Sequence, residues 1–363
     1  MKKFVRATAL AGAVALVLAA CGEAPEEEAG GGETGGGGET QATDFQGCMV
    51  TDSGGVDDRS FNASAWAGLQ QAESDLGISA KYVESNTETD FTPNVQQMVA
   101  DDCGIIITVG FLLGDATKEA AEANPEEKFA IVDFGYDEPI ENVKPLIFDT
   151  AQASFLAGYL AAGMTETGTV ATFGGINIPT VSIFMDGFVD GVEHHNETKG
   201  TDVTVLGWDK EAQNGSFTGD FQNQANGQNL TNNFIQQGAD IILPVAGPVG
   251  LGAAAAAQEA GDVKIIWVDS DGFESASQYG SLFLTSVLKQ INNAVFTATE
   301  EAAGGEYSNE PYVGTLENEG VGLAPFHDFE DEVPEELKAE LDELRQQIID
   351  GEVTVESPSS PQS

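Results

Sequence analysis

The sequence predicts two α/β domains, each built on a parallel β-sheet that helices cover on both faces. Three observations lead to this fold class. About 300 residues follow a Gly- and Glu-rich N-terminal stretch, which is enough chain for two such domains. Short, continuously apolar runs alternate with helical patterns, as buried parallel strands and their crossover helices do. This alternation occurs twice along the chain, each time with its own set of strands.

The first series of elements begins close to residue 48. Apolar, β-branched runs predict strands over residues 48–52, 81–85, 104–110, 128–134 and 146–150. Helical patterns separate the first four of these strands, over residues 62–76, 92–100 and 115–123. Each predicted helix is long enough to cross from the end of one parallel strand to the start of the next.

The second series follows a strongly apolar helix predicted over residues 153–166. Its strands are predicted over residues 169–175, 202–208, 240–247, 264–270 and 281–288. Its helices are predicted over residues 183–194, 221–236, 251–260 and 290–303, and a charged helix over residues 334–351 ends the pattern. Two domains of this kind face each other across a cleft, and ligands of such sheets bind beyond the carboxyl ends of the strands.

The N-terminus has the features of an export signal. Lys2, Lys3 and Arg6 precede an apolar stretch that is too short to span a bilayer. The stretch ends Leu-Ala-Ala-Cys, which resembles a bacterial lipobox, so residues 1–20 are predicted to be a signal peptide and Cys21 to be lipidated. The alternative is an ordinary secretory signal in which Cys21 is incidental. Residues 21–44 then predict a flexible acidic tether, which places the folded domains at the extracytoplasmic face of a cell membrane.

The charge of the chain excludes nucleic acid as a partner. Eleven Lys and Arg residues remain after Cys21 against 60 Asp and Glu residues, a net charge of about −49. Nucleic-acid binding depends on clusters of basic residues, which this sequence lacks. The acidic residues are spread over predicted helix faces and loops, which indicates a hydrated surface. An acidic surface directed at a cationic partner is the alternative.

Two cysteines remain in the predicted domains. Cys48 opens the first strand and Cys103 precedes the third, so parallel pairing would bring them side by side. In an exported protein a disulfide is the expected state, with a buried pair of thiols as the alternative. No metal site is predicted, because these residues provide too few ligands.

Polar and aromatic residues gather where the predicted strands end. These residues are Asp52, Asp133, Gly247, Asp269 and Asp271, with Phe217 in the segment after residue 208. Few cations lie near these ends beyond Arg59 and Lys289. Carboxylates accept hydrogen bonds from OH and NH groups, and phenyl rings cover flat surfaces. The ends therefore favour a neutral, hydroxyl-rich, planar ligand and disfavour a phosphate, which the aspartates would repel.

Several segments occur in an order and at a spacing that resemble a known family. They read DSGGVDDRSFNASAWAGLQQA, VGFLLGDATKEAAEANPEEKFAIVD, ASFLAGYLAAGMTETGTVATFGG, GADIILPVAGPVGLGAAAA, VDSD and LTSVLK. Over residues 47–352 the chain is similar to the basic membrane protein family of substrate-binding lipoproteins, which includes purine nucleoside receptors. The resemblance implies a type I periplasmic-binding-protein fold, with two Rossmann-like lobes, a hinge and a ligand cleft between them.

The resemblance also implies a function and partners. It implies a binding protein and not an enzyme, without cofactors, that captures nucleosides and delivers them to ABC permease subunits as a monomer. Alternatives are a lipoprotein that signals ligand to a membrane receptor, and the same fold with a sugar or another small hydroxylated ligand. A nucleoside hydrolase that uses the aspartates is a further, weaker alternative.

Site residues follow from the matching motif positions. The family's nucleoside site corresponds to Asp52, Phe61 and Asn62 in the first lobe, with Asp133 on the base. In the second lobe, Phe217 matches the stacking ring, although Phe221 or Trp208 could take that part. Asp269 and Lys289 match residues that hold the ribose, and Gly247, Gly250 and Gly252 match a turn that approaches the sugar. Asp57 and Asp58 either face the site or cap the helix that follows, because Asp before a helix satisfies free N–H groups.

The resemblance further implies lobe boundaries. The first lobe is predicted to hold residues 45–149 plus about 273–322. The second is predicted to hold residues 150–272 plus about 323–355. Residues 356–363 lack apolar periodicity and are predicted to be a disordered tail.

Overall fold

The computed structural model describes residues 44–361. The predicted signal peptide, Cys21 and all of the predicted tether except Asp44 lie outside these residues. Within the described part, none of the helices has the length and apolar character needed to cross a bilayer.

The first lobe is built on a parallel six-stranded sheet in the order β13-β5-β4-β3-β1-β2. Its strands are β1 (Gln46–Val50), β2 (Ser79–Val83), β3 (Ile105–Val109), β4 (Phe129–Val132), β5 (Val143–Phe148) and β13 (Tyr312–Gly314). The three central strands β1, β3 and β4 carry almost only buried apolar side chains, because helices cover both faces of the sheet.

The second lobe repeats this arrangement. Its six-stranded sheet has the order β14-β12-β11-β10-β6-β7, in which only β14 is antiparallel. Its strands are β6 (Thr169–Gly174), β7 (Thr204–Leu206), β10 (Ile241–Val245), β11 (Lys264–Asp269), β12 (Phe283–Lys289) and β14 (Val321–Leu323). A small hairpin, β8 (Trp208–Asp209) with β9 (Asn214–Gly215), lies beside this sheet.

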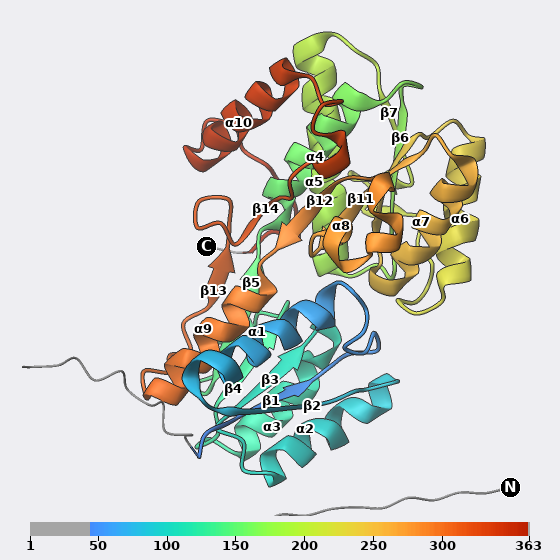
Figure 1. Ribbon diagram of the computed structural model, residues 1–363. Helices are drawn as coiled ribbons and strands as arrows, with labels where there is room; N and C mark the ends of the chain where they lie inside the picture. Colours follow the sequence, from blue (N-terminus) through green and yellow to red (C-terminus); the bar gives the residue numbers. More distant parts are fainter. Residues whose placement is uncertain (1–43, 362–363) are drawn as a thin grey trace, which may run out of the picture. The chain divides into compact units, whose positions relative to one another are not determined.

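Helices cover both faces of each sheet (Figure 1). In the first lobe, α1 and α9 pack together on one face, and α2 and α3 pack on the other. In the second lobe, α4 and α5 form one layer, α6 and α7 form the other, and α10 packs on α4. The helices are α1 (Phe61–Leu76), α2 (Phe91–Ala100), α3 (Gly114–Ala123), α4 (Thr150–Met164), α5 (Pro179–Lys199), α6 (Gln224–Gln236), α7 (Gly250–Ala260), α8 (Gly272–Ser275), α9 (Ile291–Gly304) and α10 (Glu335–Ile349). Short 3-10 turns complete the lobes: η1 (Glu88–Asp90), η2 (Phe111–Leu113), η3 (Gly247–Val249), η4 (Ser277–Leu282) and η5 (His327–Phe329).

The chain passes between the lobes three times. It crosses at Asp149, between β5 and α4, again at Gln290, between β12 and α9, and a third time in the turn between β13 and β14. The predicted assignment of residues from about 273 to the first lobe is therefore wrong up to Lys289. The reason is that β12 pairs with β11, so residues 273–289 belong to the second sheet.

Two of the differences between predicted and observed helix starts shape the cleft. α5 starts at Pro179, which suits the first helical position because its missing N–H would have no partner there. α6 starts only at Gln224, because the Asp220 carboxylate accepts the backbone N–H groups of Gln222 and Asn223 in a turn. Phe221 is therefore in a loop and not in a helix.

A disulfide joins Cys48 in β1 to Cys103, two residues before β3, with 5.9 Å between their Cα atoms. Both cysteines are buried under α2 and α3, within the same apolar cluster as Val50 and Ile106. The bond closes a loop of 55 residues that holds β2 and α2, which restricts the unfolded chain.

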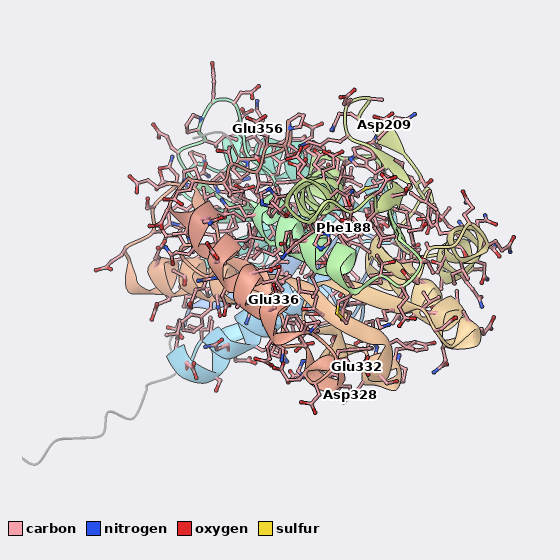
Figure 2. All side chains as sticks on the ribbon, turned by 90° about the horizontal axis from the view of Figure 1, so that it is seen from above. Phe188, Asp209, Asp328, Glu332, Glu336 and Glu356 are labelled. Carbon is pink, nitrogen blue, oxygen red and sulfur yellow. A yellow bond between two sulfur atoms is a disulfide. The ribbon has the colours of Figure 1, made fainter. Side chains whose placement is uncertain are left out.

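Acidic side chains lie on the surfaces of many different elements. Figure 2 labels five exposed acidic residues from separate segments: Asp209, Asp328, Glu332, Glu336 and Glu356. It also labels Phe188, a residue of α5 whose side chain is buried. The excess of negative charge is thus distributed over the surface, as the sequence predicts.

The predicted disordered tail needs correction for residues 357–360. The Ser357 hydroxyl donates a hydrogen bond to Asp186 Oδ2 at 2.6 Å, and the Ser360 hydroxyl donates to Asp149 Oδ1 at 3.1 Å. The sequence has no apolar periodicity here, but the hydroxyl groups donate to two carboxylates, the buried Asp186 and the half-buried Asp149, that only folding brings close to this segment. Residues 362–363 lie outside the described part of the chain.

Candidate functional site

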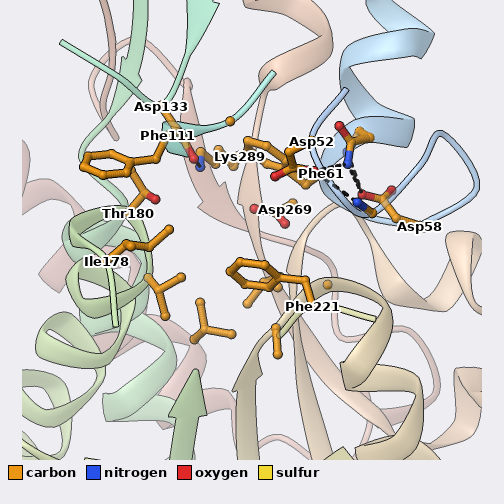
Figure 3. Close-up of a pocket in the computed structure, with 18 of the residues that line it drawn as sticks. Asp52, Asp58, Phe61, Phe111, Asp133, Ile178, Thr180, Phe221, Asp269 and Lys289 are labelled. Atoms are coloured by element: carbon orange, nitrogen blue, oxygen red, sulfur yellow. Dashed lines mark hydrogen bonds and ion pairs between the residues drawn. The ribbon is translucent and has the colours of Figure 1, made fainter. Parts of the chain in front are cut away.

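A cleft with about 620 Å³ of empty space lies between the carboxyl ends of the two sheets (Figure 3). This space includes solvent at the open side of the cleft. The first lobe lines it with Asp52, Gly54, Asp58, Phe61, Asn62, Gly110, Phe111, Leu112 and Asp133. The second lobe lines it with Ile178, Thr180, Val181, Phe184, Phe221, Val245, Ala246, Gly247, Pro248, Val268, Asp269 and Lys289.

Asp52 follows β1 and faces the cleft. Its Oδ1 accepts hydrogen bonds from Asn62 Nδ2 at 2.8 Å and from the Gly54 N–H at 3.3 Å. At the end of β3, Gly110 leaves room for this side chain, because a Cβ there would lie 2.8 Å from Asp52 Oδ2. Burial raises the pKa of the Asp52 carboxyl to about 6, and the charge of Asp58 adds to the shift.

Asp58 caps the N-terminus of α1. Its carboxylate accepts the backbone N–H groups of Ser60, Asn62 and Ala63 at 2.7 to 3.0 Å, and these groups have no intrahelical partner at the start of α1. The capping alternative therefore holds for Asp58, although the residue also borders the cleft. Burial raises the pKa of Asp58 to about 6, which these hydrogen bonds oppose. Asp57 is exposed and does not line the cleft.

Asp133 and Asp269 occupy equivalent positions at the ends of β4 and β11. Both have positive φ angles, 68° and 67°, which are uncommon for residues other than glycine. Such conformations cost free energy and are concentrated at functional sites. The turns direct both carboxylates into the same cleft from opposite lobes. Burial raises the pKa of each carboxyl, and the charge of Lys289 opposes the shift in both.

Lys289, at the end of β12, forms an ion pair with Asp133 across the two lobes. The two side chains are 3% and 7% exposed, so this is a buried ion pair. The ammonium group also lies 5.0 Å from the ring centroid of Phe61, 5.4 Å from that of Phe148 and 5.7 Å from that of Phe184. These rings attract a cation through their negative faces. The pairing places the side chains of Asp133 and Lys289 next to each other in the cleft.

Hydrogen bonds from Arg59 and Ser60 hold the lobes together on another side of the cleft. The Ser60 hydroxyl donates to Asp269 Oδ2 at 2.6 Å. Arg59 donates to the Ser275 carbonyl at 2.9 Å, and the Ser270 hydroxyl donates to the Arg59 carbonyl at 3.0 Å. The residues immediately before α1 therefore contact the second lobe directly, so their position depends on how far the lobes are closed.

Aromatic rings face the cleft from both lobes. Phe61 comes from the start of α1, and Phe221 comes from the loop before α6 (Figure 3). Gly175 leaves space for Phe221, because a Cβ at this glycine would lie 2.3 Å from its ring. Phe111, two residues after the end of β3, adds a third ring. A flat ligand between Phe61 and Phe221 would contact a ring from each lobe.

The prediction that Phe217 lines the cleft is wrong. Its ring packs edge-on against Trp208 with 5.9 Å between centroids, and it bridges to Gly174 at the end of β6. The backbone there forms hydrogen bonds with the Gly174 turn, which directs Phe217 toward the core and brings Phe221 to the cleft. Trp208 is buried and donates to Asp186 Oδ1, so it does not line the cleft either.

Gly250 and Gly252 also lie outside the cleft lining, whereas Gly247 is part of it. A Cβ at Gly250 would lie 2.8 Å from the Trp267 ring, and one at Gly252 would lie 1.9 Å from the Gln224 carbonyl oxygen. These two glycines allow α7 to pack closely on Trp267 and α6. The predicted role of both at the sugar is therefore corrected to helix packing.

α5 and the turn after β3 contribute cleft residues that the sequence does not predict. Ile178, Thr180, Val181 and Phe184 reach the cleft from the first turns of α5, and Phe111 reaches it from the turn. The predicted start of this helix at residue 183 left Ile178, Thr180 and Val181 outside it. Phe111 follows a buried strand in the same way as Asp52 does, and that position would have indicated it.

The cleft combines three carboxylates that face the ligand space, one ammonium group and apolar walls. Carboxylates accept hydrogen bonds from N–H and O–H groups, whereas the cleft offers a phosphate only one cationic partner. Among residues 44–361, no cluster of three or more His, Cys, Asp or Glu side chains is arranged to hold a metal ion. The arrangement suits capture of a neutral, flat, donor-rich molecule.

Known proteins resemble this chain along most of its length. The family description "ABC transporter substrate-binding protein PnrA-like" matches residues 45–359. The chain is 30% identical to a CD4+ T-cell-stimulating antigen of Listeria innocua, over 99% of this chain and 100% of that protein. It is also 30% identical to the ABC transporter nucleoside-binding protein BmpA of Lactococcus lactis, over 87% of this chain and 90% of that protein.

A solved structure has the same architecture. An ABC transporter solute-binding protein from Aeropyrum pernix K1 superimposes with a TM-score of 0.79 at 23% identity, over 88% of this chain and 94% of that one. Together with the two parallel sheets and the cleft between them, this likeness confirms the predicted type I periplasmic-binding-protein fold.

Proposed function

The chain belongs to the family of PnrA-like substrate-binding proteins of ABC transporters, and on this premise we propose that its cleft captures a nucleoside, preferably a purine nucleoside, for import. Family membership confirms the resemblance to the basic membrane protein family that the sequence motifs indicate. Members of this family are binding proteins of transporters and not enzymes. The observation that carries the ligand proposal is the pair of rings, Phe61 and Phe221, which face the cleft from opposite lobes.

Stacking provides the first part of the proposed recognition. A purine between two phenyl rings gains roughly 1–3 kcal/mol per stacked base contact. Since Phe61 belongs to one lobe and Phe221 to the other, both faces of the base are covered only when the lobes are closed. A ligand that contacts both rings therefore favours the closed state, which a permease can distinguish from the open one.

Hydrogen bonding provides the second part. Asp52, Asp133 and Asp269 direct carboxylates into the cleft, and each has an oxygen that can accept from a ligand. Base N–H groups and ribose hydroxyls are suitable donors. A ligand that left such a buried carboxylate without a hydrogen-bond donor would bind more weakly, because the desolvation cost of the carboxylate would not be offset.

A test of the proposal is calorimetric titration with guanosine, inosine, adenosine, uridine, ribose and guanosine monophosphate. We expect purine nucleosides to bind with micromolar or better affinity. The monophosphate should bind at least about tenfold more weakly than guanosine, because the carboxylates repel its charge and Lys289 already pairs with Asp133. Absence of binding by every nucleoside, or tighter binding of ribose alone, would contradict the proposal.

The affinity for guanosine should rise as pH rises through about 6, the raised pKa of Asp52. A donor on the ligand binds the ionised carboxylate, so binding is stronger where Asp52 is deprotonated. At pH 5 about one tenth of the Asp52 side chains are ionised, which predicts about tenfold lower affinity than at pH 7.5. Calorimetry over pH 5–8 tests this, and D52N should bind more weakly and with a smaller dependence on pH than the wild type. A wild-type affinity that is constant over this range would contradict a direct role of Asp52.

The contribution of Asp52 to folding stability changes with pH in the opposite direction to the affinity for guanosine. The pKa of Asp52 is higher in the folded protein than in the unfolded chain, so the folded protein binds the proton more tightly. The stability that this group contributes is present below its unfolded pKa of 3.8 and is lost as pH rises through about 6. Weaker binding at low pH would therefore not result from unfolding caused by Asp52.

We also propose where the protein acts. The apolar N-terminal stretch and the following Cys21 support a lipid anchor, and the acidic, Gly-rich residues after it support a tether to the membrane. The nucleoside would then be captured at the extracytoplasmic face and passed to the permease. Metabolic labelling with a radioactive fatty acid tests the anchor, and C21S should remain unlabelled.

A further inference from the structure

The C-terminal strap, residues 357–360, makes specific contacts with α5. The Ser357 hydroxyl donates to Asp186 Oδ2 at 2.6 Å, and the hydroxyls of Ser359 and Ser182 share a hydrogen bond of 2.9 Å. The Ser359 N–H also donates to Ser357 Oγ at 3.0 Å, which fixes the turn of the strap itself. Ser182 and Asp186 are four residues apart, so the strap follows one face of the helix.

The contact between Ser357 and Asp186 satisfies a buried carboxylate. The Asp186 side chain is fully buried, and its other oxygen accepts from Trp208 Nε1 at 2.8 Å and Gln213 Nε2 at 2.9 Å. A buried carboxylate without a hydrogen-bond partner is costly, so Ser357 satisfies an oxygen that the rest of the second lobe leaves for it. The strap is therefore anchored to the core of this lobe.

The other face of the same helix forms part of the ligand site. Thr180, Val181 and Phe184 of α5 line the cleft within one turn of Ser182. A shift of α5 that followed loss of the strap contacts would move these side chains directly. The position of the cleft wall is thus coupled to residues at the far end of the sequence.

The strap also reaches the hinge. The Ser360 hydroxyl donates to Asp149 Oδ1 at 3.1 Å, and Asp149 is the residue at which the chain first crosses between the lobes. The backbone N–H of Asp149 donates to the Gly314 carbonyl of β13 at 2.8 Å, which ties Asp149 to the first sheet. The strap therefore links α5 of the second lobe to a crossover that is fixed to the first.

A second cavity connects these contacts to the ligand space. It is bordered by Ser359 and Pro361, and it shares the wall formed by Phe111, Asp133, Thr180 and Lys289 with the cleft. The buried ion pair between the lobes thus lies between the ligand space and the C-terminal segment.

We propose that the C-terminal strap is a positioning element that holds α5 and the hinge in the closed arrangement and so slows release of the ligand. The serines do not contact the ligand; they act through α5 and Asp149. The inference rests on the proposed capture of a ligand in the cleft, but its structural part can be tested without one.

The first test compares hydrogen–deuterium exchange in two truncated proteins without ligand. One ends at Glu356 and lacks the strap, and the control ends at Pro361 and keeps it. Loss of the strap should increase exchange in the first turns of α5 and around Asp149, while β1 and β3 remain as protected as in the control. Unchanged exchange at α5 and Asp149 would overturn the proposal, whether or not any nucleoside binds.

The second test measures guanosine release by stopped-flow fluorescence. The protein that ends at Glu356 should release guanosine roughly three to ten times faster than the control, the range expected for loss of about one hydrogen bond that favours closure. The association rate should change little. S360A supplies a variant that keeps the fold, because Asp149 Oδ2 still accepts from Gln152 Nε2 at 3.0 Å, and S360T should restore slow release.

The outcomes separate the two proposals. Faster release together with increased exchange supports the positioning role. Equal release rates in all variants overturn it even if exchange changes. If the full chain binds no nucleoside, the proposed function fails, and the exchange experiment still decides whether the strap holds α5 and the hinge.

Discussion

Replacing Lys289 with methionine is expected to lower the free energy of unfolding by about 3–5 kcal/mol and to weaken nucleoside binding at least about 100-fold. The variant keeps the length of the side chain but leaves the Asp133 carboxylate, 7% exposed, without its buried partner. It also removes the ammonium group that lies near the rings of Phe61, Phe148 and Phe184. Asp133 would then need a proton or water to remain in the cleft, and either would change its interaction with the ligand.

Urea unfolding and calorimetry distinguish the two effects of K289M. Adding D133N to it removes the unpaired charge, so the double variant should regain much of the stability but not the affinity. D57N is the matched control for loss of an aspartate near the site, because Asp57 is exposed and outside the cleft, and it should change neither quantity. A double variant as unstable as K289M would contradict the explanation by an unpaired charge.

Phe221→Ala is expected to lower purine nucleoside affinity about 10- to 100-fold, the loss of one stacking contact of roughly 1–3 kcal/mol. The ring borders the cleft from a loop, so its removal should change the melting temperature little. The expected change lies mainly in the dissociation rate, because Phe221 completes the cover of the base only when the lobes are closed.

Phe217→Ala is the matched control for this prediction. Phe217 packs on Trp208 and Gly174, so its truncation should lower the melting temperature while affinity changes less than with F221A. Calorimetry of both variants measures the change in affinity, and thermal unfolding measures the change in melting temperature. If F217A weakened binding more than F221A in a folded protein, the stacking partner of Phe61 would have to be reassigned.

Local sequence features were sufficient to predict the fold class and part of the cleft. Buried parallel strands need continuous apolar runs, so β1, β3, β4, β10 and β11 are visible in the sequence. The residue that ends such a strand lies at the same edge as its neighbours, whatever the rest of the chain does. For this reason Asp52, Asp133, Gly247 and Asp269 could be predicted at the cleft from their positions alone.

Positions that depend on loop conformation could not be predicted in this way. Phe217 and Phe221 lie four residues apart in a polar segment, and the motif match favours Phe217, whereas the structure places Phe221 at the cleft. The choice is made by the turn at Gly174 and by Asp220, which delays the start of α6. Likewise, a glycine that approaches a ligand and one that lets two helices pack look identical in the sequence, as Gly247 and Gly250 demonstrate.

The sequence by itself determined the buried central strands, the long helices and the residues that follow those strands at the sheet edges, because these depend on side-chain pattern within a few residues. The short edge strands β13 and β14 have no such pattern and depend on pairing with β5 and β12. Only the tertiary structure decided which residues from different lobes meet: Lys289 with Asp133, Ser60 with Asp269, and Ser360 with Asp149. Each of these pairs is separated by more than 150 positions in the chain, and its energy comes from partners that become neighbours only on folding.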